Sequence, residues 1–165
     1  MKRIIISKDT NFIGSWNIND DSLCKNIVKI FEENTILHQK GGTSQGIDEK
    51  VKKSTDIGID PVDLNRKEFN DIKVYLNKLY DCYQDYKTQW PFLNKSLEVV
   101  DIPTFNIQKY EIGGHFARMH CEREGVPSMH RVFAWMTYLN DVEDGGETFF
   151  EHFNLKIKPE IGKTL

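Results

Sequence analysis

A histidine and a glutamate stand two residues apart, as His120 and Glu122, in the stretch MHCEREG of residues 119 to 125. Side chains two residues apart on an extended chain project from the same face, because strand side chains alternate with a period of two. An imidazole nitrogen and a carboxylate oxygen placed in this way can bind one metal ion together. The same pair also occurs in charged surface patches, so the surrounding sequence has to decide between the two interpretations.

Cys121 lies between the two and should point away from an ion that they face, so we interpret it as structural. The other cysteines, Cys24 and Cys82, are distant from it, and the 3 cysteines form no CxxC spacing. This pattern favours reduced thiols over a disulfide framework. We expect Cys24 and Cys82 to pack as small hydrophobic side chains.

The composition indicates one soluble globular domain. The chain has 165 residues, of which 39% are hydrophobic and 28% charged, enough for one core. Its net charge of -3 argues against the basic surface that nucleic-acid binding requires. The apolar run in the opening MKRIIIS is too short for the core of a signal peptide, and no later apolar stretch is long enough to span a membrane. We therefore expect a cytoplasmic protein without nucleic-acid or membrane partners.

Two helices are expected in the first part of the chain. Asp20 or Asp21 predicts the N-cap of a helix that runs to about Asn34, with an apolar stripe formed by Leu23, Ile27, Val28, Ile30 and Phe31. Residues 63 to 89 carry aromatic and aliphatic side chains at helical spacings and predict a long helix that Pro91 ends. We expect both helices to cover a sheet.

The segments around these helices predict loops and strands. Residues 38 to 50, HQKGGTSQGIDEK, are expected to form an exposed loop, since no GK[ST] follows the glycines as a phosphate loop requires. A short strand is expected within KKSTDIGID. From residue 102 onward TFNIQKYEI, RVFAWMTYLN, ETFFEHF and LKIKP predict strands separated by turns. Helices followed by strands favour an α+β fold with the helices packed on one sheet.

Several spaced motifs surround the His120 and Glu122 pair. YEIGGHF precedes it, and TYLND, GGETFF and PEIGKTL follow it. In this order they resemble the iron- and 2-oxoglutarate-dependent dioxygenases of the prolyl 4-hydroxylase-like branch. That branch carries a Y-x-x-G-x-x-F-x-x-H-x-D element, then YLND, GGET and a P-x-x-G-x-x-L turn. The resemblance covers about residues 104 to 165, and phage-encoded hydroxylase-like proteins look similar over the whole length.

The resemblance implies a double-stranded β-helix, a jelly-roll or cupin-like barrel that holds Fe(II) on two histidines and a carboxylate. Residues 1 to 100 would be a helical support region and residues 101 to 165 the β-rich catalytic core of a single domain, 1 to 165. His120 matches the first metal histidine. Glu122 stands where the family usually has aspartate and is interpreted as a tolerated variant; an engineered or decayed site is the alternative.

The resemblance also implies a cosubstrate pocket. Tyr138 matches a strand tyrosine that hydrogen-bonds a carboxylate of 2-oxoglutarate, and Tyr110 and Thr148 match residues of the same pocket. Met136 should share the face of Tyr138. The implied reaction hydroxylates a C–H bond while 2-oxoglutarate is decarboxylated to succinate, with Fe(II) as cofactor and 2-oxoglutarate and O2 as cosubstrates. Ascorbate is a further candidate cofactor. A peptide or protein substrate is expected, with peptidyl proline as the first candidate.

Other polar residues are assigned lesser roles. Lys52, Lys53 and Ser54 lie where related enzymes carry substrate-facing residues. Arg123 and Arg131 would flank the site, either as solvated charges or as contacts to an acidic substrate. The remaining histidines of the β-rich part are interpreted as surface or hydrogen-bonded residues: His115, His130 and His152.

The family's second metal histidine, and the basic residue that pairs with 2-oxoglutarate, both follow the P-x-x-G-x-x-L turn. The sequence ends at Leu165, within the strand that leaves this turn. We therefore expect that the chain is a fragment of a longer reading frame without its closing C-terminal strands, and that the complete protein is the enzyme. Two alternatives stay open: a non-catalytic binding module that keeps the barrel, and a metal-independent structural or interaction protein.

Overall fold

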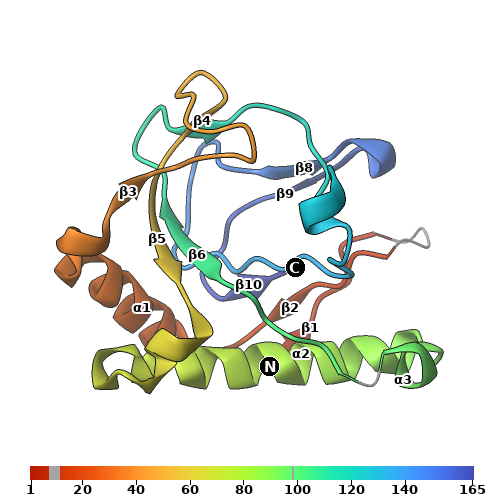
Figure 1. The fold of residues 1–165 in the computed structure, drawn as a ribbon. Helices are drawn as coiled ribbons and strands as arrows, with labels where there is room; N and C mark the ends of the chain where they lie inside the picture. The colour runs from red at the N-terminus through yellow and green to blue at the C-terminus, as the bar shows by residue number, and fades with distance from the viewer. Residues whose placement is uncertain (8–11, 98) are drawn as a thin grey trace.

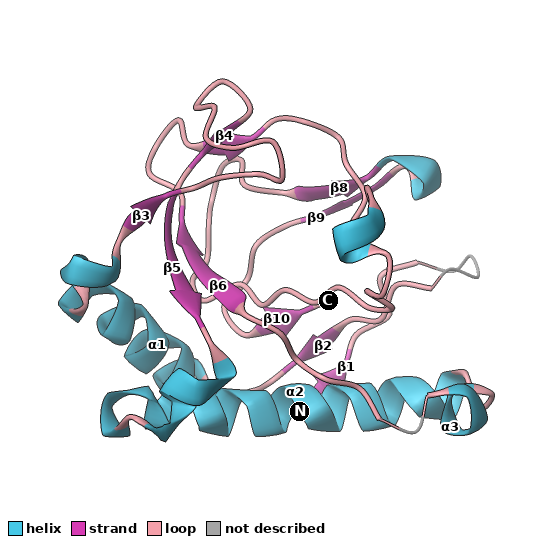
Figure 2. Ribbon diagram, in the orientation of Figure 1, coloured by secondary structure: helices cyan, strands magenta, loops and turns pink. Residues whose placement is uncertain are grey.

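The computed structural model describes residues 1–7, 12–97 and 99–165. Two helices, α1 (Asp21–Glu33) and α2 (Asn70–Gln89), lie along the lower and left edges of the molecule, and short strands occupy the space above α2 (Figure 1). A one-turn helix, α3 (Leu93–Ser96), follows α2. Figure 2 shows that loops connect and surround most of the strands. The chain is therefore a mixture of helix and antiparallel sheet, and the double-stranded β-helix stays a prediction.

Helix α1 forms where its sequence predicts it. The side chain of Asp20 accepts a hydrogen bond of 3.1 Å from the backbone nitrogen of Leu23, which satisfies one of the free N–H groups of the first turn. The buried side chains of α1 recur every three or four residues, as an amphipathic helix requires: Leu23, Cys24, Ile27, Ile30 and Phe31. Cys24 is thus part of the stripe, and Cys82 of α2 is buried in the same core.

Helix α2 begins at residue 70, so the expected start at residue 63 is wrong. Two 3₁₀ turns precede it, η2 (Pro61–Asn65) and η3 (Lys67–Phe69). Asp60 caps η2 by accepting a hydrogen bond of 3.0 Å from the nitrogen of Val62, and Pro61 fixes the first residue of the turn. The helix ends at Gln89 because Pro91 disfavours a helical backbone at Trp90.

The strands pair into four small antiparallel sheets. The first has the order β1 (Lys2–Arg3), β2 (Trp16–Asn17), β10 (Lys163–Thr164), and the second the order β3 (Gln39–Lys40), β5 (Thr55–Ile59), β6 (Phe105–Lys109). The two-stranded sheets are β4 (Lys52–Lys53) with β7 (His115–Phe116), and β8 (Thr148–Phe150) with β9 (Leu155–Ile157). Strands from residues 1 to 100 pair with later strands in three of these sheets, so the expected helical support region also contributes to the sheets.

Residues 131 to 140 do not form the continuous strand that their composition predicts. Only Thr137 makes a bridge, to Thr164, and the backbones of Met136 and Tyr138 bond to those of Leu165 and Lys163. Within the described chain, no strand pairs with the residues before Met136, so the ladder stops there. The loop expected over residues 38 to 50 is present except at its start, where β3 pairs with β5.

The β5–β6 pair separates the apolar core from a polar face. Ile57 lies opposite Ile107 in the register, and both are buried in the cluster that includes residues of α1 and α2. The alternate residues, Asp56 opposite Gln108 and Gly58 opposite Asn106, project from the other face. The helices therefore fix the orientation of a sheet whose second face carries polar groups. In the part of the chain that the structure describes, no helix has the length and apolar character needed to cross a bilayer.

Candidate functional site

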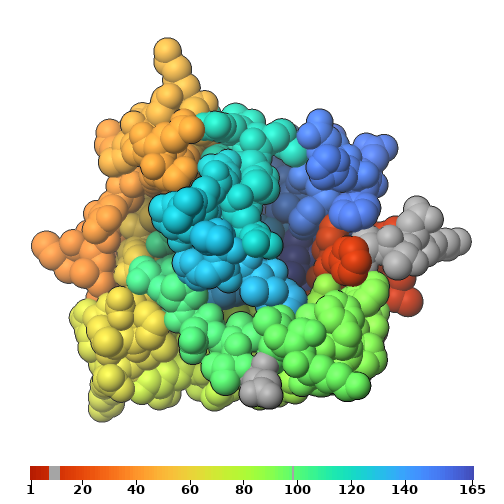
Figure 3. Space-filling model, turned by 45° about the vertical axis from the view of Figure 1, so that its right-hand side comes forward, coloured from red at the N-terminus to blue at the C-terminus, as the bar shows by residue number. Residues whose placement is uncertain are grey.

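His120 and Glu122 lie in the loop after β7 and not in a strand, yet their side chains meet. His120 Nε2 is 3.8 Å from Glu122 Oε1. Two donors that each bind one ion at about 2.1 Å and at a right angle lie about 3 Å apart. The observed separation of 3.8 Å is therefore longer than the one that a shared ion would impose. In Figure 3 the segment that follows β7, coloured teal to cyan, lies across the face of the molecule turned to the viewer.

The ring of His120 is held so that Nε2 is the free nitrogen. Nδ1 lies 2.9 Å from the carbonyl oxygen of Arg118, and because a carbonyl only accepts, Nδ1 carries the hydrogen. The neutral ring then presents its lone pair at Nε2, the arrangement that metal-binding histidines usually have. The ring also stacks on Phe116, with centroids 4.2 Å apart and an interplanar angle of 19°.

Glu122 divides its carboxylate between two neighbours. Oε1 faces His120, whereas Oε2 accepts a hydrogen bond of 2.8 Å from Arg131 Nη1. Cys121, between the two candidate ligands, is a free and exposed thiol. The described residues contain no group of three His, Cys, Asp or Glu side chains placed to hold a metal. The pair therefore fits two positions of a three-residue iron site, and residues 1–7, 12–97 and 99–165 supply no third.

The expected cosubstrate residues Met136, Tyr138 and Thr148 lie together. The Tyr138 hydroxyl donates to Thr148 Oγ1 at 2.5 Å, and Thr148 Oγ1 is 3.2 Å from Met136 Sδ. Tyr138 OH is also 3.4 Å from the carbonyl oxygen of Ile157 in β9. Burial raises the pKa of Tyr138, so the phenol stays protonated and able to donate. The group offers two hydroxyls beside an apolar thioether.

Tyr110 belongs to a different group, on the polar face of β5 and β6. Its hydroxyl donates to Gln108 Oε1 at 3.1 Å. Burial, together with the Asp56 carboxylate, raises the pKa of Tyr110 to about 12, and a hydrogen bond with Ser54 opposes the shift. Because 41% of Tyr110 is still exposed, solvent screens part of this effect.

A buried ion pair on this face was not identified from the sequence. Lys52 Nζ is 2.7 Å from Asp56 Oδ2, and the two side chains are only 3% and 10% exposed. Ser54 Oγ donates to Asp56 Oδ1 at 2.7 Å, and Gln108 Nε2 donates to Asp56 Oδ2 at 3.3 Å. Lys52 and Ser54, expected to face substrate, thus bond to Asp56 instead, whereas Lys53 is exposed.

A period-two signal in the sequence could have revealed this face. In β6 and its continuation the polar residues Asn106, Gln108 and Tyr110 alternate with Phe105 and Ile107. In β5 the buried Ile57 and Ile59 alternate with Asp56 and Gly58 in the same way. This alternation is typical of a strand with one face in the core and one face toward a polar space.

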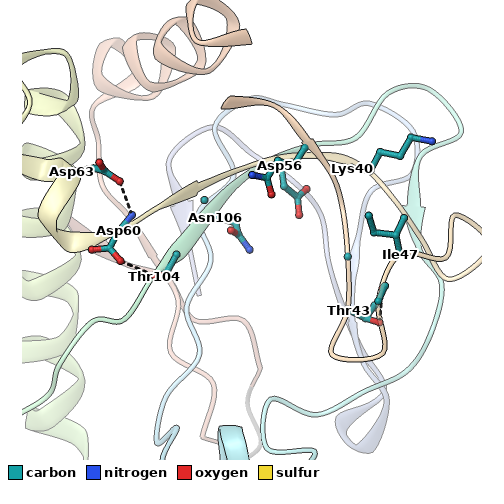
Figure 4. Close-up of a pocket in the computed structure, with 12 residues that line it drawn as sticks. Lys40, Thr43, Ile47, Asp56, Asp60, Asp63, Thr104 and Asn106 are labelled. Carbon is teal, nitrogen blue, oxygen red and sulfur yellow. Dashed lines mark hydrogen bonds between the residues drawn. The ribbon is translucent and has the colours of Figure 1, made fainter. Parts of the chain in front are cut away.

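A pocket of 560 Å³ opens on the same polar face (Figure 4). Asp56, Thr104 and Asn106 line it from the sheet, and Lys40, Thr43 and Ile47 line it from β3 and the loop that follows. At one end Thr104 Oγ1 donates to Asp60 Oδ2 at 3.3 Å, as the dashed line in Figure 4 marks. The Asp56 carboxylate therefore contributes both to this pocket and to the buried ion pair.

The other histidines of the β-rich part and Arg123 lie outside these groups, whereas Arg131 does not. The His115 nitrogens are each 3.3 Å from a backbone carbonyl oxygen, of Gly113 and of Lys50. His130 and His152 are exposed, as is Arg123. Arg131 pairs with Glu122, so it contacts the candidate site directly.

A protein described as "Probable prolyl 4-hydroxylase 9" from Arabidopsis thaliana is 33% identical to the chain over 81 residues, a match that covers 38% of this chain. The chain spans 28% of the length of that relative. No family model matches the chain. No solved structure matches it either. The likeness supports at most a prolyl 4-hydroxylase-like family, and with it an oxidoreductase.

One difference from the family motif concerns spacing. The motif has two residues between its aromatic residue and its histidine, whereas Ala117, Arg118 and Met119 separate Phe116 from His120. The added residue accompanies a loop that folds back, since the imidazole of His120 stacks on the ring of Phe116.

Proposed function

We propose that the chain carries part of the active site of an Fe(II)- and 2-oxoglutarate-dependent dioxygenase that hydroxylates a C–H bond. The observation that carries the proposal is the separation of 3.8 Å between His120 Nε2 and Glu122 Oε1, with the other ring nitrogen held by the Arg118 carbonyl. The likeness to a prolyl 4-hydroxylase supports it and makes proline in a peptide or protein the first substrate to test.

His120 and Glu122 would hold Fe(II), which when bound supplies the activation of dioxygen. Nε2 of His120 is the donor because Nδ1 is committed to the Arg118 carbonyl. The Arg131 guanidinium bonds to one carboxylate oxygen of Glu122 and leaves the other for the ion. By family resemblance the third ligand would be a histidine that follows the P-x-x-G-x-x-L turn.

Tyr138 and Thr148 would bind a carboxylate of 2-oxoglutarate. Their hydroxyls now bond to each other at 2.5 Å, and either can turn its hydrogen to an incoming carboxylate. Met136, which is 40% exposed, would supply an apolar contact on one side of the cosubstrate. Tyr110 lies with Gln108 and Asp56, and we propose that it contacts the substrate side of the site.

The pocket of 560 Å³ is the proposed place for a peptide substrate. Its sheet wall offers the amide of Asn106 and the hydroxyl of Thr104, and its loop wall offers Thr43 and the apolar Ile47. Donors and acceptors of this kind match the N–H and C=O groups of an extended peptide.

An anaerobic titration with Fe(II) and 2-oxoglutarate tests the proposal, on a protein that extends through the natural stop codon. The ternary complex is expected to give a weak visible metal-to-ligand band. His120→Ala should abolish the band and the turnover, because the remaining ligands hold iron poorly. His152→Ala removes an exposed histidine far along the chain and is the matched control, with the band retained. A band of unchanged strength in His120→Ala would reject the site.

The ion pair between Arg131 and Glu122 favours a second candidate function, a metal-free binding module. In that case the guanidinium and the carboxylate, 2.8 Å apart, form a surface contact with no ion between Glu122 and His120. Iron content after purification separates the two functions. Iron below a tenth of the protein concentration after anaerobic loading would favour the binding module.

A further inference from the structure

Burial of the charged Lys52 and Asp56 side chains costs free energy of folding. Moving two charges out of water costs several kcal/mol per ion, and their attraction recovers this only when further hydrogen bonds satisfy both groups. Here Asp56 accepts from Ser54 and Gln108 as well as from Lys52. The carboxylate is thereby attached to both β5 and β6, which the helices hold in place.

Lys52, which Asp56 holds in place, also contacts β7. It pairs with Phe116 in the register of β4 and β7, and its ammonium lies 5.7 Å from the centroid of the Phe116 ring. A cation within about 6 Å of an aromatic face is attracted to it, more strongly when both are shielded from water. Lys52 therefore restrains the ring of Phe116.

Phe116 in turn contacts His120. Their rings stack at 4.2 Å with an interplanar angle of 19°. Phe116 is 37% exposed, so the rest of the core restrains it only in part. The contacts thus run from Asp56 through Lys52 and Phe116 to the imidazole of His120.

Gly41 closes this arrangement against solvent. A Cβ atom at Gly41 would lie 2.0 Å from Ser54 Oγ and 3.1 Å from Lys52 Cε, so only glycine allows the chain to pack this closely on the pair. The Gly41 nitrogen also bonds to the Ser54 carbonyl at 2.9 Å. Lys52 is consequently too enclosed to contact a substrate while it is paired with Asp56.

We propose that Lys52, held by Asp56, is a positioning residue that sets the orientation of the His120 ring through Phe116. Its use in binding iron rests on the proposed function. The positioning itself is a property of the metal-free chain and is tested separately.

The test measures the proton chemical shifts of the His120 ring by NMR in the chain of residues 1 to 165 without metal. The stacked Phe116 ring should shift these signals upfield, and Phe116→Leu defines the value without stacking. The informative protein is the double variant that combines Lys52→Met with Asp56→Asn. It removes the cation without leaving a buried unpaired carboxylate. We expect its His120 signals to move at least half of the way to the Phe116→Leu value.

Two controls separate positioning from general stability. Lys53→Met changes the exposed neighbour in β4 and should leave the His120 signals unchanged. Lys52→Arg keeps a cation beside the Phe116 ring and should retain most of the upfield shift. Wild-type His120 signals in the double variant would overturn the proposal, and so would failure of the double variant to fold, because the pair would then hold the fold as a whole.

A second measurement links the pair to iron. In the protein extended through the stop codon, the double variant should bind Fe(II) about 10- to 100-fold more weakly, the usual effect of removing a residue that orients a ligand. If the His120 signals of the double variant do not move but the wild type binds iron normally, the positioning role alone is rejected. If those signals move as expected but the wild type binds no iron, the proposed function alone is rejected.

Discussion

Each nitrogen of the His120 ring has a different neighbour, and this difference determines what the residue can bind. Nδ1 bonds to a backbone carbonyl and Nε2 faces a carboxylate. Nε2 is therefore the nitrogen at which a metal ion shared with Glu122 would bind.

Removal of the Tyr138 hydroxyl tests the proposed cosubstrate residues. Tyr138→Phe deletes the hydrogen bond to Thr148 and should lower the free energy of unfolding by about 1 kcal/mol. In the extended protein it should also raise the 2-oxoglutarate concentration needed for half-maximal turnover. Urea denaturation and a cosubstrate titration measure the two effects. Tyr80→Phe, on a residue that is 61% exposed, is the control; equal behaviour of the two variants would make Tyr138 a wall residue only.

Between elements, a chain of hydroxyls connects α2 to the segment that carries Tyr138. The Tyr75 hydroxyl is 2.8 Å from Thr137 Oγ1, which is 2.7 Å from Thr164 Oγ1 in β10. Tyr75 is buried, so its hydroxyl has no water to replace these partners. The helix thereby fixes the position of residues 136 to 138 without a continuous strand.

Tyr75→Phe should lower the free energy of unfolding by about 1 kcal/mol near neutral pH, because one buried hydrogen bond is lost. Tyr83→Phe is the matched control on the same helix. The Tyr83 hydroxyl is buried without a hydrogen-bond partner among the described residues, so its removal should change the free energy by less than about 0.5 kcal/mol.

The stability of Tyr75→Phe should also differ from that of the wild type in its dependence on alkaline pH. Burial raises the pKa of Tyr75 from 10.0 to about 12, so its contribution to stability is complete below pH 10 and is lost as the pH rises toward 12. The wild type should lose stability over this range more steeply than Tyr75→Phe. Urea midpoints at intervals from pH 9 to pH 11 measure the difference, and parallel curves would contradict it.

Local signals account for what the sequence could predict about the elements. Helix α1 follows from Asp20 and from the spacing of its apolar residues, all within one segment. The start of α2 was misplaced because Phe69, buried at 1% exposure, continues the helical pattern from within a 3₁₀ turn. Side chains three residues apart also share a face in that conformation, so periodicity does not separate the two.

The candidate site was predictable only where its residues are close in sequence. His120 and Glu122 lie close together because only Cys121 separates them in the sequence, and Met136, Tyr138 and Thr148 were grouped through family resemblance. The pair of Lys52 and Asp56 was not predicted, and Lys52 was expected to face substrate. Its burial depends on Gly41 and Gln108, which come from other strands and loops, and no local pattern contains that information.

Across the whole molecule, Asp85 of α2 holds the N-terminal strands. Its Oδ2 accepts from Trp16 Nε1 at 2.7 Å and from Arg3 Nε at 2.5 Å. Burial alone would raise the pKa of Asp85, but the hydrogen bonds from Trp16 and Arg3 outweigh it and hold the pKa below the usual 3.8. The contribution to stability is therefore present above about pH 4 and is lost as the pH falls through the lowered value.

Asp85→Asn should cost about 1 to 3 kcal/mol of unfolding free energy at pH 7, because hydrogen bonds to a charged group are lost. The difference from wild type should be smaller at pH 3 than at pH 7, because pH 3 lies below the usual pKa of 3.8 and part of the contribution is already lost there. Asp81→Asn, one turn earlier and exposed, is the control with little change at pH 7. A deficit that is equally large at both pH values would place the effect in packing and not in charge.

Strand β2 pairs with β1 on one side and with β10 on the other, so residues 16 and 17 bond to residues 163 and 164. During synthesis the first pairing can form early, whereas the second has to wait until residues 163 and 164 have been made. Throughout that interval the nascent chain carries an open strand edge beside the unburied Trp16 and Ile18. Newly made molecules are therefore most prone to aggregate while still attached to the ribosome, and expression should respond to chaperones that bind nascent chains.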